Sequence, residues 1–325
     1  MTKKTRYFML GAAGIVVAGL CTGLVAYYGI LPGGFLQAAA GTSELSYMPA
    51  DASMVAYANV RDVMSSDLRQ RMQAIAPDGN KNREWFQGQT GINLETDVDS
   101  VVAGMVPRED RTEGVAIIRG RFDAVRLEAF ARERGGVIGE YQGIRLIERQ
   151  GSEEHGTLAF LEPGLLAAGG NAAVRAAIDC HREGGRNVTA NAELMKLVGE
   201  IEGNSNAWAV GRFDALANRA KLPDNIASQI PAIQWFSASG RVNGGVTGLF
   251  RAETRDDQSA ANLRDVVRGF LALARLQAGS KPEFQTLLES LELGGTGRTV
   301  ALSFTIPSQV FESFAPQMRQ RAEQP

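Results

Sequence analysis

The sequence predicts an α+β protein in which an N-terminal transmembrane helix precedes two tandem modules of largely antiparallel sheet with helices on one face. Two observations support this prediction. Residues 7–30 form an apolar stretch without a charge, and after them short apolar segments alternate with amphipathic ones. Many of the short segments come in pairs separated by turn residues, which is typical of hairpins and therefore of antiparallel sheet.

Length and composition support more than one folded module. The chain has 325 residues, of which 44% are hydrophobic and 22% charged, enough to bury a core in roughly two domains. We divide it into a cytoplasmic stub (1–6), a transmembrane helix (7–30), a linker (31–46) and two α+β modules (47–202 and 203–325). The stub contains three of the 34 basic residues, which leaves 31 against 36 acidic ones. This acidic balance argues against a nucleic-acid partner.

Residues 7–30 have the length and flanks of a membrane anchor. At about 1.5 Å per residue, a helix of this length more than crosses a hydrocarbon core of about 30 Å. Lys3, Lys4 and Arg6 precede it, and the first charge after it is Glu44. The positive-inside rule then places the N-terminus in the cytoplasm. We expect a single-pass protein of the inner (cytoplasmic) membrane whose body is periplasmic or otherwise extracytoplasmic.

A cleaved signal peptide is the alternative to a retained anchor. Three alanines that end at Ala40 fit the small-residue pattern of a cleavage site. The apolar stretch is longer than a usual signal core, and residues 31–34 separate it from that site. A lipoprotein signal is excluded because the bulky Leu20 precedes Cys21. We therefore favour retention.

The predicted anchor carries a candidate helix-contact face. Gly19 and Gly23 form a GxxxG pair, and Gly14, Ala18 and Thr22 repeat small residues at the same spacing. Small residues at this spacing let two membrane helices approach closely, although glycine is common in such helices for other reasons. A homo-oligomer through the membrane helix is thus one expectation.

The first module is predicted to begin with a strand at 54–60 and a helix whose Met64, Leu68, Met72 and Ile75 share one face. We expect Asp62 to cap that helix. Further strands are predicted at 101–106 and 114–119, with a helix at 122–134. Two hairpins follow, around Gln142-Gly143 and Pro163-Gly164. Helices at 172–182 and 192–201 complete the module.

The second module repeats this order in a shorter form. A strand is predicted at 207–210, followed by a helix and by a hairpin of 233–242 with 246–253, whose Asn243-Gly244 is a strong turn signal. A long helix then places Leu263, Val267 and Phe270 on one stripe. A hairpin of 287–293 with 299–306 and a helix at 308–318 end the chain. The shared order suggests an internal duplication, each copy loosely ferredoxin-like.

One pentapeptide, GRFDA, occurs twice, at 120–124 and at 211–215. It reads most simply as a strand-to-helix junction in which Phe enters the core and Asp caps the helix. The alternative is a ligand site built from paired Arg and Asp side chains.

A search for chemistry along the sequence gives no catalytic, cofactor-binding or metal-binding residues. There is no phosphate-binding loop and no nucleophile elbow. Cys180 and His181 are adjacent on a predicted helix, where their side chains diverge, and His155 lies in a polar loop. The acidic pairs Asp97/Asp99, Glu153/Glu154 and Asp256/Asp257 lack the further ligands that a calcium site requires. We expect no cofactor.

Residues 47–202 resemble a family of bacterial membrane-tethered proteins of unknown function with an exported, repeated α+β domain. The resemblance rests on YMPAD at 47–51, the strand VAYANV at 55–60, and LLAAGG at 165–170 followed by AAVRAAID at 172–179. It implies an anchored, exported domain and supplies no catalytic residues.

The leading functional hypothesis is a non-enzymatic cell-envelope protein that binds another protein or a surface polymer through its sheet or between its modules. Two alternatives remain open. One is an enzyme with a carboxylate-based site between the modules, and the other is a lipid-binding envelope protein with an apolar groove under the helix at 263–276.

Overall fold

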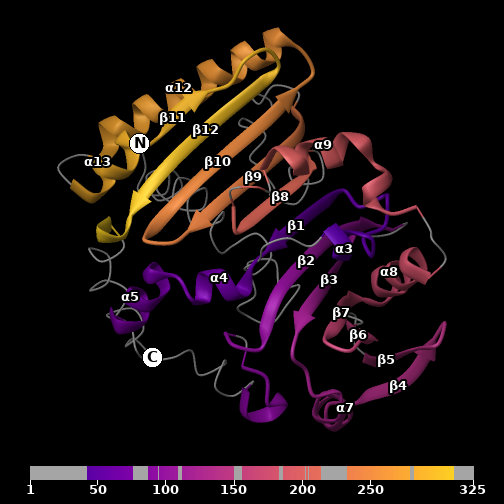
Figure 1. The fold of residues 1–325 in the computed structure, drawn as a ribbon. Helices are drawn as coiled ribbons and strands as arrows, with labels where there is room; N and C mark the ends of the chain where they lie inside the picture. Colours follow the sequence, from indigo (N-terminus) through magenta and orange to yellow (C-terminus); the bar gives the residue numbers. More distant parts are fainter. Residues whose placement is uncertain are drawn as a thin grey trace. The chain divides into compact units, whose positions relative to one another are not determined.

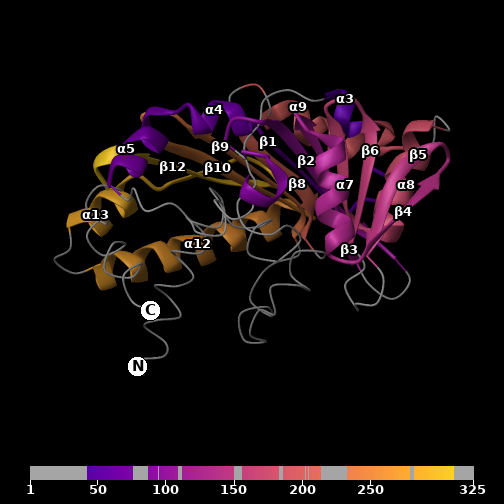
Figure 2. The ribbon, with the colours of Figure 1, turned by 90° about the horizontal axis from the view of Figure 1, so that it is seen from below.

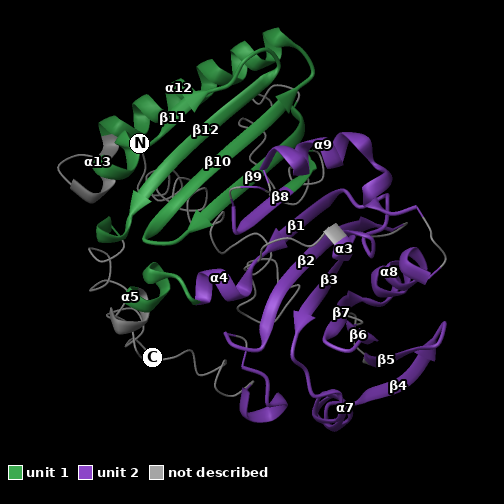
Figure 3. Ribbon diagram, viewed as in Figure 1, with its two compact units in different colours: residues 1–23, 65–77, 210–325 green, residues 24–64, 78–209 purple. Residues whose placement is uncertain are grey.

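The computed structural model describes residues 42–75, 87–93, 95–108, 112–149, 156–182, 186–201, 203, 205–213, 233–278 and 282–310. These residues form an α+β fold dominated by antiparallel sheet. They belong to two compact units, which are coloured separately in Figure 3. Unit 1 comprises residues 1–23, 65–77 and 210–325, and unit 2 comprises residues 24–64 and 78–209.

The sheet of unit 2 has the strand order β1-β2-β3-β7-β6-β5-β4, and every neighbouring pair is antiparallel. The strands are β1 (Met54–Ala58), β2 (Val98–Pro107), β3 (Thr112–Gly120), β4 (Gly136–Tyr141), β5 (Ile144–Arg149), β6 (Gly156–Glu162) and β7 (Leu165–Gly170). A further strand, β8 (Ala207–Arg212), starts in unit 2 and ends in unit 1. The Trp208 ring lies 5.4 Å from that of Tyr57 on β1.

Helices cover both faces of this sheet. They are α3 (Thr42–Leu45), α4 (Val60–Met64), α7 (Ala124–Glu133), α8 (Asn171–Arg182), the short 3₁₀ helix η2 (Val188–Ala190) and α9 (Ala192–Ile201). Leu127 of α7 packs with Ala116 and Ile118 of β3. The carboxylate of Glu113, which points to the other face of β3, accepts a hydrogen bond from Ala173 N of α8 at 3.0 Å. The prediction of helices on one face is therefore wrong for unit 2.

Unit 1 has helices on one face of its strands, as the sequence predicts. The strand order is β11-β12-β10-β9, all antiparallel, with β9 (Ile233–Val242), β10 (Gly245–Thr254), β11 (Glu292–Gly294) and β12 (Thr299–Pro307). The helices are α5 (Asp67–Ile75), α12 (Asp257–Ala278) and α13 (Pro282–Glu289). Figures 1 and 2 show α12 running along these strands. Leu263 of α12 packs on Val300, and Leu68 of α5 packs with Phe304 and Ile306, which lie on the same face of β12 as Val300.

The hairpins predicted from turn residues are confirmed. Asn243 and Gly244 join β9 to β10. Gln142 and Gly143 join β4 to β5 with φ of 49° and 74°, as expected for a turn whose two central residues both have positive φ. Gly164 joins β6 to β7 with φ of 78°, which fits a type II turn.

Three predictions of local structure are wrong. The strand at 287–293 is helix α13 up to Glu289, and only β11 pairs with β12; Pro282 at the first position favours that helix. The helix expected through 75 is broken into α4 and α5, because Ser66 Oγ accepts a hydrogen bond from Arg69 N at 3.2 Å and starts a new helix. Asn59, rather than Asp62, caps α4 through a 2.6 Å hydrogen bond from Asp62 N.

No helix within the described ranges is long and apolar enough to cross a membrane. The predicted anchor at 7–30, with Gly19 and Gly23, lies outside those ranges. The predicted modules at 47–202 and 203–325 differ from the compact units in two segments. Residues 203–209 belong to unit 2 and not to the unit that contains the rest of the second module. Residues 65–77 belong to unit 1 although they come early in the chain.

Candidate functional site

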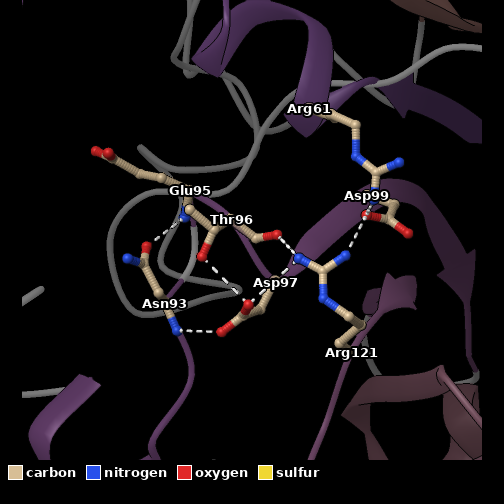
Figure 4. A network of polar contacts seen from close by, with 7 residues as sticks. All are labelled: Arg61, Asn93, Glu95, Thr96, Asp97, Asp99 and Arg121. Carbon is tan, nitrogen blue, oxygen red and sulfur yellow. Dashed lines mark hydrogen bonds and ion pairs between the residues drawn. The ribbon is translucent and has the colours of Figure 1, made fainter.

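Two aspartates of unit 2 lie between two arginines in the network drawn in Figure 4. Asp99, on β2, forms an ion pair with Arg61 of α4. Arg121 Nη2 lies 3.4 Å from Asp97 Oδ1, and Arg121 Nη1 lies 4.0 Å from Asp99 Oδ1. Asp97 and Asp99 therefore lie close together, and two arginines balance their negative charge in place of a metal ion.

A tight turn ahead of β2 positions Asp97. Asn93 N donates to Asp97 Oδ2 at 2.9 Å, and Thr96 Oγ1 donates to Asp97 Oδ1 at 3.2 Å. Arg121 N donates to Asp97 O at 2.7 Å. The neighbouring Gly120 has no room for a side chain, because a Cβ atom there would lie 2.1 Å from Asp97 O. This polar cluster fastens the start of β2 to the end of β3.

The first GRFDA copy is a strand-to-helix junction. Asp123 caps α7 by accepting hydrogen bonds from Val125 N at 3.0 Å and Arg126 N at 3.1 Å. Phe122 packs against the core that contains Leu127. Arg121 pairs with Asp97 and not with Asp123, so this copy does not form the predicted Arg/Asp site. Asp214 of the second copy lies outside the described residues.

A second polar cluster surrounds Tyr47 in unit 2; it comprises Glu44, Tyr47, Arg119, Glu162 and His181 and is called the Tyr47 cluster below. The rings of Tyr47 and His181 are stacked, with centroids 4.1 Å apart and an angle of 11° between the planes. Tyr47 Oη donates to Glu162 Oε1 at 3.1 Å. His181 Nε2 lies 3.7 Å from the same oxygen. Sequence patterns gave no sign of this cluster, because its members come from four segments that are far apart in the chain.

The buried members of the Tyr47 cluster are held in fixed protonation states. Burial raises the pKa of Glu44, but hydrogen bonds from Ser43 and Arg119 outweigh it, so the pKa lies below its ordinary value and the group stays ionised. Burial, followed by the hydrogen bond to the Glu162 carboxylate, raises the pKa of the Tyr47 phenol. Tyr47 thus remains a neutral donor. This arrangement fastens α3 to the sheet and offers no activated nucleophile.

The other predicted chemical groups have local roles where they are described. Cys180 is a free thiol whose pKa is raised, first by burial and then by Asp51 and Asp179. Asp256 caps α12 through a 2.7 Å hydrogen bond from Ser259 N, and that bond lowers its pKa to about 2. His155 and the Glu153/Glu154 pair lie outside the described residues. In the ranges that the structure describes, no three His, Cys, Asp or Glu side chains are grouped to hold a metal ion.

Among the described strands of unit 2, one has a neighbouring strand on one side only. β4 is the last strand in the sheet order and pairs with β5 from Gly136 opposite Arg149 to Tyr141 opposite Ile144. Figure 1 shows it at the margin of the sheet. The Val137 side chain on β4 is 47% exposed. Tyr141 at the far end is fixed by Arg175 of α8, whose guanidinium lies 4.8 Å from the ring centroid.

Comparisons with known proteins support the fold and give no function. No protein-family model matches the chain, and no curated protein matches it. Crystal form I of TP0453 is similar over 86% of this chain and 98% of that one, with a TM-score of 0.52 and 10% identity. Crystal form III of TP0453 is similar over 83% and 96%, with the same TM-score and identity. At this identity the likeness concerns the fold alone.

Proposed function

We propose that this chain is a non-enzymatic cell-envelope protein that is anchored in the inner membrane by residues 7–30 and binds another protein through the outer edge of β4. The N-terminus lies in the cytoplasm and the body outside it. We also propose that the body arose by duplication of a loosely ferredoxin-like module, as the order of elements in the two halves suggests.

The edge of β4 is the observation that supports binding most directly. A strand at the margin of a sheet presents free backbone N–H and C=O groups, to which an extended segment of a partner can add as a further strand. Proteins commonly block such edges with lysine or proline, or with very short strands. β4 has six residues, GVIGEY, with one charged side chain, the exposed Glu140, and neither lysine nor proline. Its exposed Val137 offers an apolar contact beside the free edge.

The polar groups described above favour binding over catalysis. A catalytic carboxylate or thiol needs a pKa that its surroundings shift toward reactivity and a side chain that can reach a substrate. Asp97 and Asp99 are balanced by arginines. The raised pKa of Cys180 favours the unreactive thiol. These groups support the structure of unit 2.

The experiment compares two valine-to-lysine variants of the full chain. Val137→Lys places a charge beside the β4 edge, whereas Val125→Lys changes a valine on α7 that is more exposed, at 77%. Each chain is fused to a proximity-labelling enzyme at its C-terminus and expressed in its native cell. We expect Val137→Lys to lose one or more labelled envelope proteins that the unchanged chain and Val125→Lys both label.

Two outcomes contradict the proposal. If the three chains label the same proteins equally, β4 is not the binding edge. If the purified full chain turns over a substrate, the protein is an enzyme.

Anchoring is tested separately by alkaline carbonate extraction of membranes and by protease protection of the body in sealed cells. Release of the chain by carbonate would remove the anchor from the proposal.

A further inference from the structure

The backbone groups at the outer edge of β4 come from alternate residues. The turn Gln142-Gly143 joins β4 to β5, so Tyr141 and Ile144 lie opposite each other beside it. Residues that flank a two-residue hairpin turn exchange both backbone hydrogen bonds, and farther along the strands bonded and non-bonded pairs alternate. The residues whose N–H and C=O groups point away from β5 are therefore Gly136, Ile138 and Glu140.

The side chains of β4 alternate between the two faces of the sheet. A Cβ atom at Gly136 would lie 2.8 Å from Ala131 O of α7, whereas Tyr141 contacts Arg175 of α8. Because successive residues of a strand point to opposite faces, Val137 lies on the α8 face with Tyr141. The α7 face of β4 therefore contains Gly136, Ile138 and Glu140, and the α8 face contains Val137, Gly139 and Tyr141.

The sequence of β4 is complementary to itself about Ile138. We consider a second copy of β4 that lies antiparallel to the first, with the two Ile138 residues opposite each other. Val137 of one copy then lies opposite Gly139 of the other. Glu140 lies opposite Gly136 in the same way, so each larger side chain meets a glycine. The outward backbone groups form about six hydrogen bonds, two for each bonded pair.

Charge and shape both favour this register. The two Glu140 carboxylates lie about 14 Å apart along the strands, at about 3.4 Å per residue. Centring the pair on Gly139 instead leaves about four hydrogen bonds and makes the two carboxylates diagonal neighbours. With Ile138 at the centre, Tyr141 of the second copy lies diagonally from Val137, within the reach of an aromatic side chain. The exposed valine is then covered.

We infer that the protein bound at the β4 edge is a second copy of this chain, whose own β4 pairs with it antiparallel, with Ile138 opposite Ile138. The inference rests on the proposed function and names the partner at the same edge. One pair of short strands buries less than the roughly 1,200 Å² of a stable interface. The proposed anchors, with Gly19 and Gly23, raise the effective concentration of one edge at the other. Loss of either contact therefore separates the copies.

The test is disulfide crosslinking between full chains in membranes, after Cys21 and Cys180 have been replaced by serine. One chain carries Val137→Cys, and a second chain with a different tag carries Gly139→Cys. In the inferred register these positions form a non-hydrogen-bonded pair, with Cα atoms about 4.5 Å apart, which suits a disulfide. Gly139 accepts the side chain, because an added Cβ atom would meet only Leu146 Cδ1, at 3.6 Å.

We expect a disulfide-linked dimer from the mixed chains and at least about tenfold less from either variant alone. Identical positions lie about 8 Å apart on the diagonal, beyond the range of a disulfide. Ile138→Cys alone should form the dimer as well, because Ile138 lies opposite itself at about 5.5 Å. The control mixes Gly139→Cys with Val125→Cys, an exposed position on α7, and should give no dimer.

Each other outcome overturns the inference. A dimer from Gly139→Cys alone, and not from the mixture, means a different register. A control that crosslinks as well as the mixture means random collision. If no sample crosslinks while Val137→Lys still loses a labelled protein, a different protein binds β4 and the proposed function stands. If that labelling is unchanged as well, the proposed function fails with the inference.

Discussion

At the scale of single residues, the most informative group is the buried carboxylate of Glu44. It lies near the start of the described chain, is 4% exposed, and pairs with Arg119, which comes from β3. A charge this deeply buried is destabilising unless it is paired and hydrogen-bonded. Glu44 therefore determines how firmly α3, the first described helix, is held on unit 2; this helix lies inside the segment 31–46 that was predicted to be a linker.

The stabilisation from Glu44 should depend on pH. Its folded pKa lies below the ordinary value of 4.5, so the ionised group stabilises the fold above that value, and this contribution is lost as the pH falls through the folded pKa. We expect Glu44→Gln to lower the free energy of unfolding at pH 7 by about 1–2 kcal/mol, since Arg119 is half exposed. The difference from the unchanged protein should close toward pH 3.

Urea unfolding between pH 7 and pH 3 measures this difference. Glu133→Gln serves as the control, because Glu133 is an exposed carboxylate in the last turn of α7. A Glu44→Gln chain as stable as the unchanged one at pH 7 would contradict the role assigned to the Glu44–Arg119 pair.

Gly120 should not tolerate a methyl group. A Cβ atom there would lie 2.1 Å from Asp97 O and 3.0 Å from Val98 Cα, both backbone atoms. We expect Gly120→Ala to cost about 1–3 kcal/mol, as overpacking typically does. Gly156→Ala, where nothing lies within 4 Å of the added atom, should change stability by less than about 0.5 kcal/mol. Thermal unfolding of both variants checks this, and equal melting temperatures would contradict it.

At the scale of elements, sequence patterns predicted the structures that depend on residues close together in the chain, such as hairpin turns. Asn243-Gly244 and Gln142-Gly143 indicated hairpins because turn geometry requires those residue types. Patterns failed where an element depends on distant contacts. The sequence predicts the β4–β5 hairpin but not that β4 lies at the margin of the sheet, because strand order depends on pairings such as β3 with β7. The free edge was therefore visible in the structure alone.

The predicted membrane helix should associate through its GxxxG face. Gly19→Leu together with Gly23→Leu removes the close approach that small residues allow and should abolish self-association. Gly14→Leu adds the same bulk about 160° around the helix from the midpoint of that pair and should leave it intact. Crosslinking of the full chain in membranes measures the dimer. A dimer lost in Gly14→Leu instead would move the contact to the face with Ala18 and Thr22.

At the scale of the whole molecule, the chain passes between its two units three times after the first described residue, Thr42, near residues 64, 77 and 209. This follows from Leu68, whose side chain packs in the unit 1 core with Val246 and Phe304. The Leu68 N–H also donates to Asn243 O at 2.9 Å. Residue periodicity predicted an apolar face that includes Leu68, but not which unit would bury it. Sequence patterns did not reveal the Glu44–Arg119 pair either, because its two residues are 75 positions apart in the chain.

Two leucine variants test this division. Leu68→Ala should cost about 2–5 kcal/mol, as buried leucines usually do, and should speed hydrogen exchange in β10 and β12 more than in β2 and β3. Leu146→Ala, at a position 1% exposed in unit 2, should show the reverse distribution. Exchange of the full chain followed by mass spectrometry resolves the strands. Equal effects of both variants on all strands would indicate a single cooperative unit.

The placement of α5 also has a consequence for biosynthesis. Leu68 leaves the ribosome well before its packing partner Phe304, which follows on the order of 230 residues later. At synthesis rates of about 5–20 residues per second, that delay is roughly ten seconds or more. During this time the segment 65–77 has no completed core to enter, while the residues of unit 2 are already available by residue 209. Unit 2 is thus able to fold first, while α5 has to wait for the strands of unit 1.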